Sequence, residues 1–117
     1  MVACLDIGHV GLPSGNLEAW EFIRILGHDR LQALHVHDND YTNDQHSLPY
    51  SGKIDWAEVT QALGLINYSG DFTYECLLGR MYNLSQDEVC SSVLKYAEQI
   101  GRHLIKRIEA NRTTVWA

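Results

Sequence analysis

The side chains best suited to bind a divalent cation lie where three short apolar segments of the sequence end. They are Asp6 and His9 after the first segment, His35 and His37 at the end of the second, and Glu75 in the third. Carboxylates and imidazoles are common protein ligands of such cations. A carboxylate, an imidazole and a second carboxylate, from Asp6, His35 and Glu75, therefore form a candidate metal-binding set.

A long polar loop between residues 39 and 53 offers a second group of candidate ligands. It contains Asp44 and His46, which His9 could join. Two imidazoles and one carboxylate form a three-ligand set that suits zinc with one open position. Loops of this length inside compact domains are usually functional.

Taken alone, each of these residues also has a structural interpretation. A carboxylate at the end of a strand often caps a helix or forms a salt bridge. His37 is typical of a residue that supports a site or faces solvent, and Asp38 and Asp40 are typical of residues that order a loop. The metal hypothesis depends on the conjunction, because these ligand-type residues fall at strand exits and none of them lies mid-helix.

The order of the predicted elements explains why these strand ends would meet. Strand and helix alternate three times, which predicts a parallel sheet with right-handed crossovers. In such sheets, ligands bind beyond the carboxyl ends of the strands. The predicted strands are residues 2–5, 31–36 and 72–77, and the predicted helices run from an Asn16 cap to Gly27, from an Asp55 cap to Ile66, and from a Ser85–Glu88 capping box to about Ile108 with a bend at Gly101.

The alternation of side chains along a strand assigns the strand residues to faces of the sheet. Leu34, Val36, Phe72 and Tyr74 are expected to pack outward against helices. With helices on one side only, the opposite face would be bare, whereas parallel sheets are normally covered on both faces. We therefore expect a homo-oligomer in which two copies bury this face. Its residues would be Cys4, Asp6, Ala33, His35, Thr73 and Glu75.

Length and composition limit the class of protein. The chain has 117 residues, which predicts a single domain over residues 1–117. Its net charge of −6 argues against a nucleic-acid partner. No apolar run reaches the length of a membrane helix, no basic segment opens a signal peptide, and the three cysteines form no CxxC pair. These features together predict a cytoplasmic protein without a membrane partner.

Five short motifs follow one another on the alternating strand–helix units. They are Leu5-Asp6-Ile7-Gly8-His9, His35-Val36-His37-Asp38, Asp44-Gln45-His46, Gly52-Lys53-Ile54-Asp55-Trp56 and Tyr74-Glu75. Together they resemble the xylose isomerase-like TIM-barrel superfamily, which includes sugar phosphate isomerases and epimerases and apurinic endonucleases of the endonuclease IV type. The resemblance spans about residues 3–78, and the last helix fits the helix that closes the barrel. A complete barrel has eight strands in ~250 residues. The resemblance thus implies an α/β fold of three βα units, the C-terminal part of a TIM barrel.

The resemblance also implies a cofactor, a substrate and a reaction. In this family the counterparts of Asp6, His35 and Glu75 bind a divalent cation, which here would be Mn, Mg, Co or Zn. The substrate would be a sugar or a sugar phosphate. Its carbonyl would be polarised by the metal, so that Glu75 moves a proton through an ene-diol.

The resemblance leaves three functions open. One is the isomerase or epimerase, in whose branch the counterpart of His9 contacts substrate. Another is an endonuclease IV-like phosphodiesterase, with a further zinc on His9, Asp44 and His46. A third is a non-catalytic barrel fragment that still holds metal. The family's other glutamate ligand, the second base of the epimerases, has no counterpart in this sequence, and Tyr41 stands where some ketose epimerases have an arginine.

Overall fold

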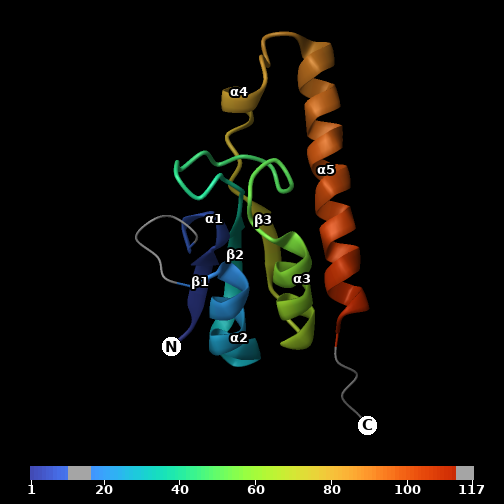
Figure 1. Ribbon diagram of the computed structural model, residues 1–117. Coiled ribbons are helices and arrows are strands. Elements are labelled where there is room, and N and C mark those ends of the chain that lie inside the picture. The colour runs from blue at the N-terminus through green and yellow to red at the C-terminus, as the bar shows by residue number, and fades with distance from the viewer. Residues whose placement is uncertain (11–16, 113–117) are drawn as a thin grey trace.

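The computed structural model describes residues 1–10 and 17–112, whose centre is a three-stranded parallel sheet (Figure 1). The strands are β1 (Ala3–Asp6), β2 (Leu31–Val36) and β3 (Asp71–Tyr74), in the spatial order β1-β2-β3. Asp6 is paired with His35, and His35 with Thr73, so the carboxyl ends of the strands meet at one edge. The predicted α/β fold, a partial TIM barrel, is confirmed.

Three helices, α2 (Ala19–Arg30), α3 (Trp56–Leu65) and α5 (Asp87–Ala110), lie on one side of this sheet (Figure 1). The short α1 (Ile7–Val10) follows β1 directly, and the short α4 (Leu78–Met81) lies beyond the carboxyl end of β3. α2 packs against α3, and α3 packs against the long α5 (Figure 1). The core between helices and sheet includes Leu34 and Val36 from β2, Ile23 from α2, Leu63 from α3 and Leu104 from α5, all less than 2% exposed. On the opposite face, Cys4 and Thr73 are exposed.

The helix α2 starts later than predicted, whereas the predicted start of α3 is confirmed. α2 begins at Ala19, where the Glu18 backbone N–H donates to Glu21 Oε1 at 3.0 Å; the predicted cap, Asn16, and the predicted loop 11–15 lie outside the described residues. Helical geometry in α2 breaks at Gly27, which adopts a φ of 72° that favours glycine. The Asp55 cap of α3 is confirmed by its side chain, which accepts the N–H of Glu58 at 3.0 Å.

The capping box predicted for the last helix is wrong. Gln86, and not Ser85, precedes α5, and the N–H of Ser85 instead donates to Asn83 Oδ1 at 3.0 Å. The turn before the helix therefore uses Ser85 in a local hydrogen bond, and among the described residues no side chain caps α5. The structure also adds the short α4, which the sequence pattern did not predict.

Tyr74, the last residue of β3, packs against the glycine in α5. The predicted strand ended at residue 77, but β3 ends at Tyr74, whose hydroxyl donates to the carbonyl of Ala97 at 2.7 Å. A Cβ on Gly101 would lie 3.1 Å from this hydroxyl, so the glycine gives β3 and α5 room to approach. α5 runs unbroken through Gly101, and the predicted bend is absent.

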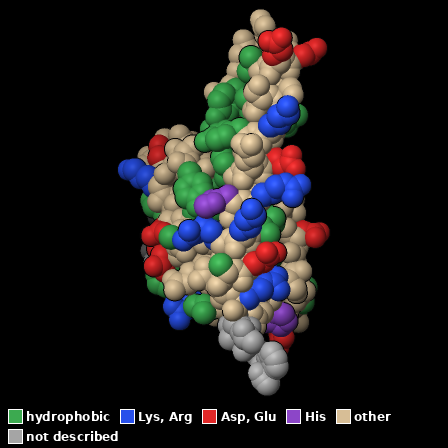
Figure 2. Space-filling view, turned by 90° about the vertical axis from the view of Figure 1, so that its right-hand side faces the viewer, with side chains coloured by type: hydrophobic (Ala, Val, Ile, Leu, Met, Phe, Trp, Pro, Cys, Tyr) green, Lys and Arg blue, Asp and Glu red, His purple; other side chains and the backbone are tan. Residues whose placement is uncertain are grey.

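The long helix leaves an apolar surface beside the free edge of β3. A cavity of about 580 Å³ opens there, lined by Phe72 and Tyr74 of the strand and by Leu94 and Ile105 of the helix, among others. Figure 2, viewed from the side of α5, shows hydrophobic side chains gathered along its upper half. Within the described ranges, no helix combines the length and the apolar character that crossing a membrane requires.

Candidate metal centre

Three ligand-type side chains converge at the carboxyl ends of the three strands, as the sequence predicted. Asp6 is the last residue of β1, His35 is the last but one of β2, and Glu75 follows β3 directly. One ligand atom from each lies within 4.8 Å of the other two. His35 Nδ1 is 2.8 Å from Glu75 Oε2, and the Glu75 backbone N–H donates to the carbonyl of Val36 at 3.0 Å. This last bond continues the sheet ladder by one residue and holds Glu75 beside β2.

These three side chains are accessible as well as close. Asp6 is 25% exposed, His35 45% and Glu75 39%. Two carboxylates and an imidazole form a mixed oxygen and nitrogen set, which suits a divalent cation of the Mn, Mg, Co or Zn kind. A small molecule could therefore reach the same point from the open face of the sheet.

Asp6 is held in place by two histidines. His37 Nε2 lies 2.5 Å from Asp6 Oδ1, which also accepts the backbone N–H of His9 at 3.0 Å. His9 Nδ1 lies 2.9 Å from the other oxygen, Oδ2. The carboxylate is thus fixed from two sides before any ligand binds, which is how supporting residues orient metal ligands.

His37 was not among the predicted ligands, and the structure gives it a supporting position. It is completely buried, and its Nδ1 is a buried side-chain atom without a hydrogen-bond partner among the described residues. Desolvation lowers the pKa of His37 against the opposing effect of Asp6, so burial favours the neutral ring, which donates through Nε2. A Cβ on Gly8 would lie 2.0 Å from the His37 ring, which shows how closely the backbone covers it.

The second predicted set, His9, Asp44 and His46, is also brought together. Asp44 Oδ2 lies 2.9 Å from His9 Nε2, and Asp44 Oδ1 lies 3.1 Å from His46 Nε2. Desolvation would raise the pKa of Asp44, but the hydrogen bond from His9 and the charge of His46 outweigh it, so this pKa lies below its ordinary value. Asp44 is therefore a carboxylate that bridges two imidazoles.

Both imidazoles of this cluster face oxygen atoms that accept hydrogen bonds. His46 Nδ1 faces the carbonyl oxygen of Glu75 at 2.9 Å, and a carbonyl only accepts, so Nδ1 carries a proton. His9 faces a carboxylate with each of its nitrogens. Protonated rings, or a cation held between the rings and Asp44, would each satisfy these contacts. The donor set of two imidazoles and one carboxylate is thus compatible with a metal.

A set of three histidines is the less suitable alternative. His9, His37 and His46 also bring ligand atoms within 4.8 Å of one another. The rings of His37 and His46, however, are stacked at 4.1 Å with an angle of 7°. An imidazole coordinates in its own plane, and one ion cannot lie in two parallel planes. We therefore assign His37 to support and retain His9, Asp44 and His46 as the second candidate set.

Asp38 organises the loop that carries Asp44 and His46. It is completely buried, and its two oxygens accept five hydrogen bonds. The donors are the backbone N–H groups of Asn39, Tyr50, Gly52 and Ile54 and the indole N–H of Trp56, at 2.8 to 3.2 Å. The predicted role of Asp38 in loop order is thus observed, and the Trp56 ring joins the loop to α3.

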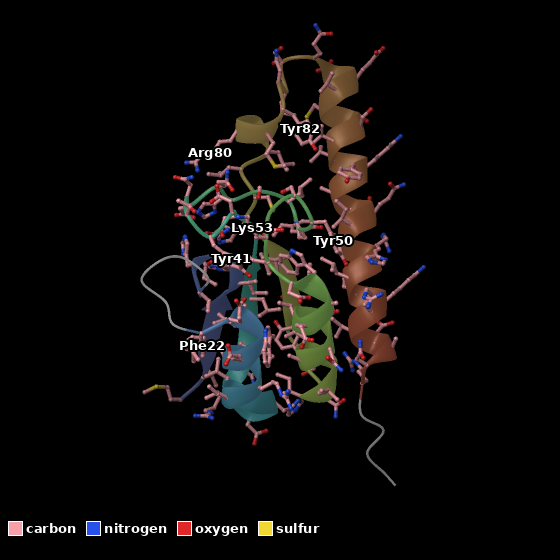
Figure 3. The ribbon with its side chains drawn as sticks, viewed as in Figure 1. Phe22, Tyr41, Tyr50, Lys53, Arg80 and Tyr82 are labelled. Atoms are coloured by element: carbon pink, nitrogen blue, oxygen red, sulfur yellow. The ribbon has the colours of Figure 1, made fainter. Side chains whose placement is uncertain are left out.

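Arg80 is a neighbour of the site that the sequence pattern did not single out. It lies on the unpredicted α4, and its Nη1 donates to the backbone carbonyl of Asp44 at 3.3 Å (Figure 3). Tyr41, which stands where some relatives have an arginine, donates its hydroxyl to Glu18 Oε2 at 2.9 Å.

Comparison with known proteins establishes the family. A family profile described as xylose isomerase-like TIM barrel matches residues 1–105. The chain belongs to this family. It is similar to the uncharacterized protein y4fM of Sinorhizobium fredii, with 34% identity over 110 residues that cover 93% of this chain and 32% of that protein.

A solved relative agrees with the fold. The crystal structure of a D-tagatose 3-epimerase-like protein superposes with a TM-score of 0.63 and 21% identity, over 93% of this chain and 36% of that one. At this identity, the comparison shows that the two proteins share a fold. The chain therefore spans about a third of the length of these two relatives.

Proposed function

We propose that the chain carries the metal site of a divalent-metal-dependent sugar isomerase or epimerase. Asp6, His35 and Glu75 would hold the metal, and Glu75 would move the substrate proton. The observation that carries the proposal is the convergence of three ligand atoms within 4.8 Å at the carboxyl ends of three parallel strands. The family membership and the fold shared with a D-tagatose 3-epimerase-like protein support sugar chemistry at this position.

The chemistry divides between a cation and the side chains of this chain. A divalent cation bound at Asp6, His35 and Glu75 would polarise a sugar carbonyl and make the neighbouring C–H bond more acidic. His37 and His9 would keep Asp6 oriented through the contacts to both of its oxygens. The backbone bond from Glu75 to Val36 would keep the glutamate at its strand end.

Glu75 is the side chain that we propose as the base. Its Oε2 contacts His35 at 2.8 Å, while Oε1 is 3.6 Å from His46 Nδ1 and less tightly held. The carboxylate would take a proton from the carbon next to the carbonyl and return it to the adjacent carbon on the same face of an ene-diol.

Isomerisation and epimerisation differ in the bases that they need. Transfer between adjacent carbons on one face needs one base, whereas inversion at a carbon needs a base on each face. Glu75 would serve as a base in either reaction. We therefore propose isomerisation or epimerisation of a sugar as the reaction of this site.

Proton exchange in deuterated water tests the proposal most simply. The purified chain with Mn²⁺ or Co²⁺ is incubated with a panel of aldoses, ketoses and their phosphates, and NMR follows deuterium at the carbon next to the carbonyl. We expect exchange that Glu75→Gln abolishes and that Glu98→Gln, a matched change on the exposed surface of α5, leaves intact. Full exchange in Glu75→Gln would refute the role of Glu75.

Metal affinity separates the alternatives. Calorimetry should show a bound ion that Asp6→Asn and His35→Asn each weaken by about tenfold or more. A bound ion without exchange on any sugar would overturn catalysis and favour a non-catalytic metal-binding fragment. No bound ion in the unaltered chain would remove the basis of the proposal.

A second candidate function is phosphodiester hydrolysis at abasic DNA. The contacts of Asp44 with His9 and His46 favour it, because this set suits zinc. Chelator-sensitive nicking of an abasic duplex, lost in Asp44→Asn, is the expected result for this alternative. Absence of nicking in the zinc-loaded protein would exclude it.

A further inference from the structure

A second cavity, of about 530 Å³, opens beside the candidate metal centre, between the 39–53 loop and α4. Its lining residues are Asp44, Gln45, Ser47, Ser51, Arg80 and Met81. Asp44 belongs both to this lining and to the cluster with His9 and His46. A molecule in the cavity would therefore contact Asp44, a member of the second candidate set.

Arg80 is the cation in the lining of this cavity. One of its guanidinium nitrogens, Nη1, donates to the carbonyl of Asp44 and thereby holds the side chain against the loop. Among the residues that the structure describes, no carboxylate forms an ion pair with Arg80. A guanidinium held in this way keeps further N–H groups for a ligand, in a planar arrangement that matches a phosphate.

The nearby carboxylate of Asp44 forms no ion pair with Arg80. Both side-chain oxygens of Asp44 face imidazoles, at 2.9 and 3.1 Å, and its backbone carbonyl is the group that faces Arg80. The side-chain amide of Gln45 and the hydroxyl of Ser51 add neutral polar groups to the lining. In a chain of net charge −6, Arg80 is a local site for an anion beside the metal centre.

We propose that this cavity binds the phosphate group of a sugar phosphate, with Arg80 as the anion-binding residue. The inference rests on the proposed function, since the other end of the sugar would lie at Asp6, His35 and Glu75. A neutral sugar offers only hydroxyl groups and gains little from a guanidinium. A phosphate monoester forms charge-assisted hydrogen bonds with it, which are stronger than neutral ones.

Binding of defined probes tests the proposal without any turnover. Calorimetry on the whole chain, with Mg²⁺ present, compares inorganic phosphate, ribose 5-phosphate and ribose. We expect ribose 5-phosphate to bind about tenfold or more tightly than ribose. Arg80→Ala should bind ribose 5-phosphate about as weakly as ribose, because a charge-assisted hydrogen bond raises the affinity by roughly a factor of ten or more. Arg80→Lys keeps the positive charge but loses the planar guanidinium, so its affinity for ribose 5-phosphate should lie between those of Arg80→Ala and the unaltered chain.

A matched arginine and the metal itself provide the controls. Arg102→Ala removes an exposed arginine of α5 that pairs with Glu98, and it should leave the affinity for ribose 5-phosphate unchanged. Unchanged affinity in Arg80→Ala, or equal affinity for ribose and ribose 5-phosphate, would overturn the proposal. Tighter binding of a short DNA duplex than of ribose 5-phosphate would assign the site to a polynucleotide and would also overturn it.

The two proposals fail in different ways. Arg80→Ala should bind Mn²⁺ as tightly as the unaltered chain, because Arg80 is not among the candidate ligands. Loss of metal binding in the unaltered chain counts against the proposed function. Intact metal binding with an Arg80-independent affinity for phosphate counts against this inference alone.

Discussion

Replacement of Asp38 by asparagine should destabilise the loop that carries Asp44 and His46, two of the six candidate ligands. An asparagine can keep one carbonyl oxygen in the position of Oδ2, which accepts three of the five hydrogen bonds. Its NH₂ group then faces the backbone N–H groups of Asn39 and Ile54, which now donate to Oδ1. Two buried donors lose their acceptor, at about 1–3 kcal/mol each, so we expect a loss of about 2–6 kcal/mol in the free energy of unfolding.

Urea unfolding followed by tryptophan fluorescence measures this loss, because Trp56 donates its indole N–H to Asp38. Asp40→Asn is the matched control in the same loop; its retained oxygen still accepts from Thr42 and Asn43, and its stability should match the unaltered chain. Trp56→Phe removes one donor of the five and provides a milder variant that should fold; because it lacks the fluorescent reporter, its unfolding is followed by circular dichroism. A stability within error of the unaltered chain for Asp38→Asn would refute this account of the loop.

Two further substitutions test the packing, and one measurement on the unaltered chain tests the assembly. Gly8→Ala inserts a methyl group 2.0 Å from the His37 ring and should cost about 1–3 kcal/mol in urea unfolding; unchanged stability would contradict the close packing. Tyr74→Phe removes the hydrogen bond to Ala97 and should lower stability by about 1 kcal/mol, measured by thermal unfolding, and a stabilised variant would argue against that bond. The open sheet face and the apolar cavity beside α5 lead us to expect self-association, so light scattering after size exclusion should give more than the monomer mass of 13.3 kDa at micromolar concentration. A stable monomer there would refute that expectation.

Much of the site could be predicted because it depends on strand geometry. Asp6, His35 and Glu75 follow apolar segments, and parallel strands bring their carboxyl ends to one edge. The observed pairing of Asp6 with His35 follows from that rule and needs no knowledge of the helices. The Asp55 cap was predictable for a similar reason, because it depends on residues three positions apart.

The features that could not be predicted depend on contacts between distant parts of the chain. The five donors to Asp38 come from residues up to 18 positions away, and the stack of His37 on His46 joins the end of β2 to the loop. The hydroxyl of Tyr74 bonds to the carbonyl of Ala97, 23 positions away, which joins β3 to α5. A local pattern carries no information on such contacts.

The most direct test of the metal centre is an anomalous difference map from crystals of the protein soaked in Mn²⁺. We predict a peak within coordination distance, about 2–2.5 Å, of Asp6, His35 and Glu75 together. A map at saturating Mn²⁺ without density between these three side chains would contradict the claim that they form a metal site.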